Sequence, residues 1–412
     1  MSEIIKGGPF SNVYFSAVKH QFFDDKGISH KTQFLVLRDR DTGLIVKFTE
    51  LEYLNAPFTE AKPVYHKTDP KHHLYCIANA LNFIFLEQWW NFHIEKLSDV
   101  TRDMIFKAFD TYVETPVNGK YRSQQSIDLY VKNVSAFFAN ASLFSPNFKV
   151  KPGDLFYKKK TESKNTLKKI EGIWTPIYHR KSLKNSEGVL MRKIPTEAID
   201  ILISQAKEHD PQLVFMIIVG ITAGLRVSEI CNLRQCESPV SSIAGIQFSY
   251  EGNAVTKILI DLTEEFCLRS DKVFVGGIKK HRTVQIYKPF IREFLEGYTY
   301  HMELLKSITY EKKFSPMFVD RRGKAMTSET MTDRFNTLVT KYFISALYAS
   351  GNPKLITYAQ ELESKHLTPH ILRHYFTVRL VLLGLDPPSI AKLRGDKSED
   401  SSRTDAYNKA VL

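Results

Sequence analysis

The feature that most constrains this chain is a short basic segment near its C-terminus. Residues 368–376 read Thr-Pro-His-Ile-Leu-Arg-His-Tyr-Phe, and Tyr407 follows downstream. His370 and Arg373 stand three apart, so on a helix their imidazole and guanidinium groups share one face and can converge on one phosphate. Tyr407 could supply a nucleophile. The pattern therefore favours a site where a phosphate meets two cationic groups and a tyrosine.

A second basic segment lies far upstream. Residues 220–234 read Gly-Ile-Thr-Ala-Gly-Leu-Arg-Val-Ser-Glu-Ile-Cys-Asn-Leu-Arg. The apolar spacing predicts a helix that begins at Arg226, with Glu229 one turn further along. Arg226 is thus a third cation available to the same site.

In their residues and their order along the chain, these segments resemble motifs of the tyrosine recombinases, the phage-integrase family of DNA strand-exchange enzymes. Catalytic domains of that family carry T-G-L-R-x-S-E, a lysine on a β-hairpin, T-P-H-x-L-R-H, a second His or Trp, and a terminal tyrosine. The resemblance extends over residues 70–412 and is strongest over 215–234 and 366–407. It implies a multidomain α+β protein with a small N-terminal β module, a helical core-binding (SAM-like) domain, and a mainly helical catalytic domain with a small antiparallel sheet.

Composition agrees with a nucleic-acid partner. A chain of 412 residues predicts two or three domains. Its formal net charge of +12 and pI near 9.2 favour a polyanion, because basic surfaces displace counterions from phosphates. No apolar run approaches the length of a spanning helix, about 20 residues, and the N-terminal residues lack the apolar core of a signal peptide. We expect a cytoplasmic, nucleoid-associated protein without membrane contact.

No cofactor is expected. The four cysteines, at positions 76, 231, 236 and 267, are too few and too irregular for a disulfide framework, and we expect them to be reduced core residues. The chain contains no P-loop and no pattern of metal ligands. The resemblance implies strand exchange without ATP or a divalent metal.

The N-terminal half divides into two predicted parts. In residues 1–65, strands at 33–38 and 44–48 flank a turn at 39–43, which predicts a β-hairpin module. Several family members use such a module to bind accessory arm sites, and a structural or protein-contact role stays open. Residues 71–148 show helical spacing, and we expect the family's helical core-binding domain over 66–150, although a generic helical bundle has the same pattern.

Residues 151–185 have the composition of a basic linker, and the catalytic domain is expected over 186–412. Charge runs are commonly solvated surface, but in a two-domain clamp this segment would lie against the DNA backbone. The predicted DNA-contacting residues are Lys158, Lys159, Lys160, Lys168, Lys169, Arg180 and Lys181.

The family resemblance assigns roles to the basic residues. Cleavage of a phosphodiester requires neutralisation of charge on the phosphorus oxygens and a proton for the leaving oxygen. Arg226 and Arg373 would clamp the non-bridging oxygens with paired N–H donors. Glu229 would orient active-site groups. His370 would bond the phosphate or accept the proton of Tyr407, since its ordinary pKa near 6.5 allows both.

Three further residues are candidates for supporting or acid roles at the site. His374 is expected to support the helix rather than touch the phosphate, because it points about 100° away from Arg373. Residues 272–287 are predicted as two strands around a short turn. From this hairpin Lys279 is our first choice for the family's general-acid lysine, and Lys280 the second.

Two departures from the family pattern lie near the C-terminus. Residues 390–398 resemble I-x-x-L-x-G-H-x-S, but Asp396 stands where the histidine belongs, and an ionised aspartate cannot donate. Lys397 or Arg394 could substitute, or activity could be weaker. The five residues after Tyr407 are too few for a stable helix, and two explanations stay open: the chain is shortened at this end, or subunits contact each other elsewhere, in the 299–365 region.

The sequence therefore predicts a site-specific tyrosine recombinase, the integrase or transposase of a mobile element, that forms a 3′-phosphotyrosyl intermediate. The expected partners are double-stranded DNA with inverted-repeat core sites, further copies of the chain (a tetramer on DNA, a monomer or dimer when free), and an accessory DNA-bending or directionality protein. Two alternatives stay open: a type IB topoisomerase-like enzyme, and a catalytically weak DNA-binding regulator with the same fold. The target sequence stays open too, because base readout depends on individual side chains.

Overall fold

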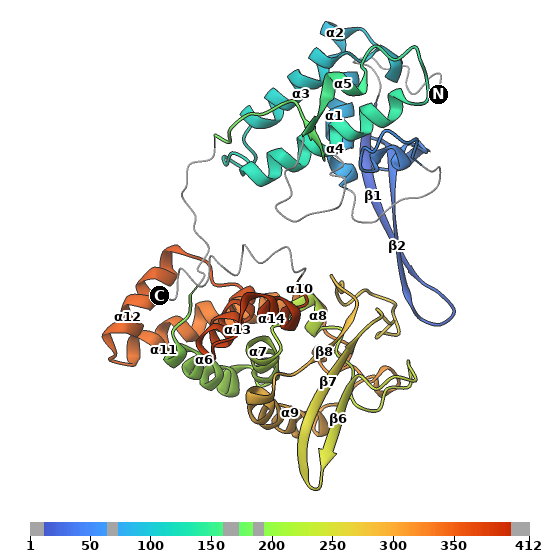
Figure 1. Ribbon diagram of the computed structural model, residues 1–412. Helices are drawn as coiled ribbons and strands as arrows, with labels where there is room; N and C mark the ends of the chain where they lie inside the picture. Colours follow the sequence, from blue (N-terminus) through green and yellow to red (C-terminus); the bar gives the residue numbers. More distant parts are fainter. Residues whose placement is uncertain (1–11, 64–72, 160–172, 184–192, 397–412) are drawn as a thin grey trace, which may run out of the picture. The chain divides into compact units, whose positions relative to one another are not determined.

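The chain folds into two compact units. The computed structural model describes residues 12–63, 73–159, 173–183 and 193–396 (Figure 1). One unit comprises Met1–Phe22 with His30–Glu187, and the other comprises Phe23–Ser29 with Gly188–Leu412. Each unit has its own hydrophobic core. Within the described ranges, no helix combines the length and apolar character that crossing a membrane requires.

A three-stranded sheet, with strand order β1-β2-β3, begins the first unit. Its strands are β1 (Val13–Phe23), β2 (Ser29–Asp39) and β3 (Ile45–Phe48). β2 and β3 pair antiparallel, as the sequence predicted. The turn between them forms because Asp39 Oδ1 accepts from the Thr42 backbone N–H at 2.8 Å, and Gly43 adopts a φ of +68°.

Helices make up most of the rest of this unit. The helical spacing predicted over 71–148 is confirmed for the described residues of that range, and the side chains of Thr101 and Ser123 cap the two longest helices by accepting from backbone N–H groups. The helical elements are η1 (Glu52–Asn55), α1 (Leu74–Asn82), η2 (Phe83–Glu87), α2 (Trp89–Phe92), η3 (Leu97–Asp99), α3 (Arg102–Glu114), α4 (Gln124–Ser142) and α5 (Pro152–Leu155).

Sheet and helices of the first unit share one hydrophobic core. The amide of Asn82 on α1 bonds both backbone groups of Phe15 on β1, at 2.7 and 2.9 Å. The segment expected as a basic linker contributes a two-stranded antiparallel sheet, β4 (Phe156–Lys159) with β5 (Ile173–Pro176). Phe156 is buried in the shared core, so the start of this segment is part of the unit.

The second unit is built around one buried helix. α7 (Gln212–Thr222) is buried along all of its length except the first residue, and α6 (Thr196–His209), α9 (Ile291–Lys306) and α13 (His370–Leu382) pack on it. The remaining helical elements are α8 (Val227–Ile230), η4 (Lys288–Phe290), η5 (Lys312–Phe314), α10 (Ser328–Leu338), η6 (Val339–Phe343), α11 (Ile344–Ala349), α12 (Pro353–Ser364) and α14 (Pro387–Arg394).

A three-stranded antiparallel sheet, with order β6-β7-β8, completes this unit, and α9 lies against it (Figure 1). Its strands are β6 (Ile246–Glu251), β7 (Ala254–Leu262) and β8 (Arg282–Gln285). The two-stranded hairpin predicted within 272–287 is wrong, because β8 pairs with β7 across a long connection, residues 263–281. Backbone groups of that connection bond elsewhere, for example Ser328 N to Val275 O at 2.6 Å, and so are unavailable for a strand pair.

Candidate active site

Arg226 stands at a sharp turn between two helices. The turn passes through Gly224, whose φ is +61° and whose position admits no side chain, since a Cβ there would lie 2.3 Å from the Phe376 ring. Arg226 is the N-cap of α8, which is a single turn. A helix does begin at Arg226, as the sequence predicted, but it is only one turn long.

Glu229 is a fully buried carboxylate that holds two arginines. Its Oε2 accepts from the Arg226 backbone N–H at 3.1 Å, and its Oε1 accepts from Arg226 Nη1 at 3.0 Å and Arg282 Nη1 at 3.3 Å. Burial alone would raise the pKa of Glu229. The charge of Arg282, the Arg226 backbone N–H and the charge of Arg226 outweigh burial and lower that pKa. Glu229 thus stays ionised and orients both guanidinium groups.

Arg282, at the start of β8, was not among the predicted site residues. One pattern could have revealed it: Arg282 and the buried Val284 are two apart on a strand, so they share a face. A charged residue on the inward face of a strand needs a buried partner. That partner, Glu229, is far away in sequence, and the strand pattern alone does not identify it.

Arg373, one turn into α13, is buried with 1% of its side chain exposed. Its Nη1 donates to Gly224 O, and its Nη2 donates to Arg394 O and to Asp396 Oδ1, each at 3.0 Å. Its Nε is buried without a hydrogen-bond partner. Burial, followed by the charges of Arg226 and Arg394, lowers the pKa of Arg373 to about 10, and the two carboxylates oppose that change.

Asp396 lies among the cations rather than at a separate position. Its Oδ1 is 3.0 Å from Arg373 Nη2, 3.8 Å from Arg226 Nη2 and 4.0 Å from Lys280 Nζ. Its Oδ2 is 3.0 Å from Arg394 Nε. One carboxylate thus forms ion pairs with four cationic side chains. Replacement of the expected histidine by Asp396 therefore changes the charge at the centre of the site.

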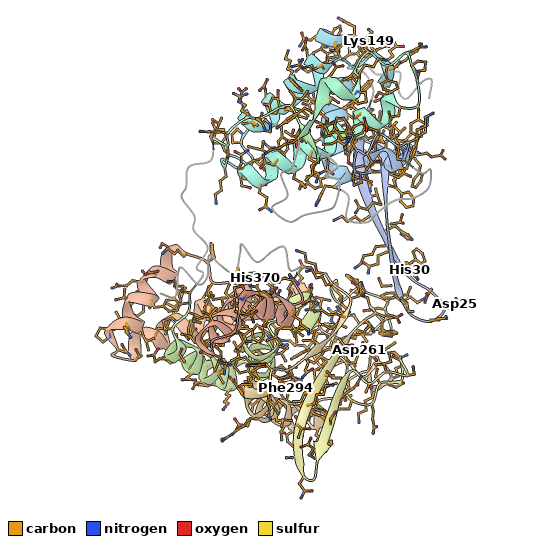
Figure 2. The ribbon with its side chains drawn as sticks, in the orientation of Figure 1. Asp25, His30, Lys149, Asp261, Phe294 and His370 are labelled. Carbon is orange, nitrogen blue, oxygen red and sulfur yellow. The ribbon has the colours of Figure 1, made fainter. Side chains whose placement is uncertain are left out.

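His370 is the first residue of α13 and an exposed residue (Figure 2). Partial burial of its ring, and then the charges of Arg373, Arg226, Arg394 and Lys279, lower the pKa of His370 to about 4. The imidazole is therefore neutral near pH 7 and able to accept a proton. The ring of His374 packs edge-on against it, with 4.7 Å between centroids, a position suited to supporting His370.

Both candidate lysines belong to this neighbourhood. Lys279 is exposed, and its charge contributes to lowering the pKa of His370. Lys280 has its Nζ beside Asp396, and its backbone carbonyl accepts from Arg282 Nη1 at 2.8 Å. The connection that carries them comes close to α8 at Gly276, where a Cβ would lie 2.9 Å from the Ser228 backbone. The geometry does not choose between the two lysines.

Several predicted residues lie outside the described ranges: Tyr407, Lys397, Lys160, Lys168 and Lys169.

Four predicted DNA contacts are described, all in the first unit. Lys158 pairs with Glu60 at 3.8 Å and lies over the ring of Trp174. Arg180 donates to Asp110 and Glu114. Lys159 and Lys181 are exposed. Arg180 is thus bound to carboxylates of its own unit, whereas Lys159 and Lys181 present their charge to solvent.

The cluster as a whole suits an anion. Among the described residues, five cationic side chains pair with two carboxylates, Glu229 and Asp396; the five are Arg226, Lys280, Arg282, Arg373 and Arg394. This surplus of positive charge can stabilise a phosphate and the additional charge that develops during its cleavage. No group of three His, Cys, Asp or Glu side chains in the described part of the chain is placed to hold a metal ion.

A cavity of about 690 Å³ lies elsewhere in the second unit, along α10. Two arginines that line it are already paired, Arg334 with Asp210 and Arg269 with Asp320. The cavity contains no residue of the arginine cluster, and the site chemistry does not involve it.

Comparisons with known proteins give structural similarities at low sequence identity. No model of a known protein family matches the chain, and no curated protein matches it. The XerH site-specific recombinase bound to its difH substrate is 13% identical, with 81% of this chain and 75% of that chain covered and a TM-score of 0.45. The Tn1549 transposon integrase with a circular-intermediate DNA is 18% identical, with 76% and 80% covered and a TM-score of 0.44.

A lambda integrase dimer bound to a core site is 13% identical, with 73% of this chain and 80% of that chain covered and a TM-score of 0.39. These solved structures are those of integrases and a site-specific recombinase, the class of enzyme that the two basic segments of this chain resemble in sequence.

Proposed function

We propose that this chain is a site-specific tyrosine recombinase, the integrase or transposase of a mobile element. The proposal rests on the contacts of one oxygen atom, Asp396 Oδ1, which lies 3.0 Å from Arg373 Nη2 and 3.8 Å from Arg226 Nη2. Arginines from two distant segments thus meet at one anionic oxygen. A non-bridging phosphate oxygen presented there would contact both guanidinium groups, as a phosphodiester clamp requires.

The proposed reaction is attack by the Tyr407 hydroxyl on the scissile phosphorus. The bond from phosphorus to the tyrosine oxygen forms, and the bond to the 5′ oxygen breaks. His370, neutral near pH 7, accepts the phenol proton, and a lysine, Lys279 or Lys280, protonates the leaving 5′ oxygen. Arg226 and Arg373 neutralise charge that builds on the phosphorane oxygens. The products are a 3′-phosphotyrosyl link and a free 5′-hydroxyl.

The second half of the proposed reaction reverses the first with a different strand. A 5′-hydroxyl from the partner duplex attacks the phosphotyrosyl link, restores a phosphodiester and releases Tyr407. Because one phosphoester replaces another at each step, neither ATP nor a divalent metal is required by the chemistry.

The wider assembly is part of the same proposal. Residues 66–150 act as the core-binding domain and residues 186–412 as the catalytic domain, with four copies joining two DNA sites that have inverted repeats. Exposed Lys159 and Lys181 contact the DNA backbone. A basic protein of this kind works on DNA in the cytoplasm, with an accessory DNA-bending protein as a further partner.

Covalent capture on DNA tests the proposal. Nicked duplexes are first selected from a random pool by binding to the wild-type protein, then incubated with it in EDTA and run on a denaturing gel. We expect a protein–DNA adduct with the wild type and none with Tyr407→Phe. Tyr250→Phe, which alters a tyrosine 63% exposed on β6, is the matched control and should form the adduct.

Two results of this experiment would contradict the proposal. An adduct with Tyr407→Phe would mean that another residue is the nucleophile. Tight, salt-sensitive DNA binding without any adduct would favour a DNA-binding regulator that lacks catalysis.

A further inference from the structure

Asp396 holds the position among the arginines that a phosphate oxygen would need. We propose that Asp396 is an internal competitor for the scissile phosphodiester, a carboxylate that substrate must displace from the arginine cluster before cleavage. The inference rests on the proposed function for the identity of the substrate. It makes the site self-restrained: the carboxylate of Asp396 occupies part of the cluster until a phosphodiester of sufficient affinity takes over its contacts.

The first argument is the chemical equivalence of the two groups. A carboxylate and a phosphate both offer paired oxygens at the spacing that guanidinium N–H donors recognise. Asp396 uses both of its oxygens, with Oδ1 near Arg373, Arg226 and Lys280, and Oδ2 near Arg394. Two of these cations, Arg226 and Arg373, are the ones that the proposed reaction places on the phosphate oxygens.

The second argument counts the donors of Arg373. Both N–H groups of its Nη2 are engaged, one with Arg394 O and the other with Asp396 Oδ1. Its Nη1 donates to the backbone carbonyl of Gly224, and its Nε is buried without a hydrogen-bond partner. Of the three occupied contacts, two go to backbone oxygens within the fold, so the contact with Asp396 is the one that an incoming anion can replace. With 1% of its side chain exposed, Arg373 has no room to turn toward a ligand elsewhere.

The third argument is the contrast between the two carboxylates of the site. Glu229 is fully buried and accepts a backbone N–H, so it is built into the turn at α8. Asp396 keeps 18% of its side chain exposed and follows Gly395, the left-handed C-cap of α14. A Cβ at Gly395 would lie 2.3 Å from Arg282 Nε, so the chain passes close against the cluster here. Asp396 is thus at the accessible edge of the site, where displacement by substrate is feasible.

Removing the charge of Asp396 should therefore strengthen anion binding. A carboxylate within about 4 Å of a bound phosphate repels it strongly at a partly buried site, so we expect Asp396→Asn to bind inorganic phosphate at least about tenfold more tightly than the wild type. Asp386→Asn removes the same charge from an exposed residue at the other end of α14, where it makes no side-chain cap. This control should bind phosphate as the wild type does.

The measurement is calorimetric titration of the full chain with inorganic phosphate, with thermal unfolding to verify that each variant is folded. Asp396→His, which introduces the residue of the family pattern, is a second variant without the carboxylate and should also bind phosphate more tightly. Unchanged or weaker phosphate binding by a folded variant of either kind would overturn the proposal, and would make Asp396 a residue that positions Arg373 and Arg394.

DNA cleavage separates this inference from the proposed function. Phosphate binding requires no catalysis, so tighter binding by Asp396→Asn supports the competitor role even if no protein forms an adduct. An adduct with the wild type, together with equal phosphate affinity in wild type and Asp396→Asn, would leave the proposed function standing and refute the inference. On nicked DNA at subsaturating protein, we expect Asp396→Asn to form the adduct from a lower protein concentration than the wild type.

Discussion

Substitution of Glu229 by glutamine probes the buried charge network on which the site depends. Glutamine keeps the shape of the side chain and can still accept from the Arg226 backbone N–H, but it leaves Arg226 and Arg282 without their shared counterion. Removing one partner of a buried ion pair costs roughly 3–5 kcal/mol. Arg226 and Arg282 keep 21% and 16% of their side chains exposed, so solvent offsets part of that loss, and we expect about 2–3 kcal/mol of destabilisation.

Urea unfolding followed by far-ultraviolet circular dichroism measures this change. The free energy of unfolding usually falls by about 1–3 kcal/mol per molar urea, and a value at the upper end of that range predicts that the unfolding midpoint shifts down by about 1 M. All three tryptophans, Trp89, Trp90 and Trp174, lie in the first unit. Their fluorescence reports that unit alone, and its transition should not move in Glu229→Gln.

An exposed ion pair provides the matched control. Glu296 pairs with Arg292 one turn away on α9, with 65% and 91% of the two side chains exposed. Glu296→Gln should change the stability by less than about 0.5 kcal/mol. If Glu229→Gln shifts the dichroism midpoint no more than Glu296→Gln does, the reasoning about a buried network at Glu229 is refuted.

Three further results are expected. In NMR titrations the imidazole of His370, assigned with His370→Gln, should titrate near pH 4. Bound inorganic phosphate should raise the pKa of His370, because its negative charge offsets the nearby cations. An unchanged pKa in the presence of phosphate would place the anion elsewhere. Burial lowers the pKa of His301 to about 4, so the folded protein holds this ring neutral where the unfolded chain would protonate it. The free energy of unfolding is therefore highest above pH 6.5 and should fall by about 3 kcal/mol as the pH drops from 6.5 to 4. Urea unfolding across that range should show the loss, and His301→Phe should reduce it. Gly224→Ala should lower the free energy of unfolding by more than about 3 kcal/mol in the same assay, since the added Cβ would overlap Phe376. Gly351 also has a positive φ, +67°, but a Cβ there meets open space, so Gly351→Ala should cost only about 1 kcal/mol. Equal losses in the two variants would refute the packing argument.

Local patterns were enough to predict several elements. The strands predicted at 33–38 and 44–48 around the turn at 39–43 form the β2–β3 hairpin, and the apolar spacing further along predicted helices such as α3 and α4. The spacing of His370 and Arg373 placed both on the first turn of α13. In each case the physical cause lies within a few residues of sequence, which is why one sequence sufficed.

The missed features depend on contacts between distant segments. Nothing local identifies Arg282 as the second partner of Glu229, because the pair forms only after the connection at 263–281 folds beside α8. The same holds for β8, whose partner strand precedes that connection. Asp396 was recognised as a departure from the family pattern, but its four ion-pair partners lie at the start of α8, on the connection at 263–281, on α13 and on α14.

The central claim, that Tyr407 carries the DNA, is tested most directly by mass spectrometry of the covalent adduct. After nuclease and trypsin digestion, we expect a nucleotide 3′-phosphate on the peptide Thr-Asp-Ala-Tyr-Asn-Lys, residues 404–409, whose tyrosine is Tyr407. A nucleotide on His-Tyr-Phe-Thr-Val-Arg, residues 374–379, or on any other tyrosine peptide would contradict the assignment and the mechanism built on it.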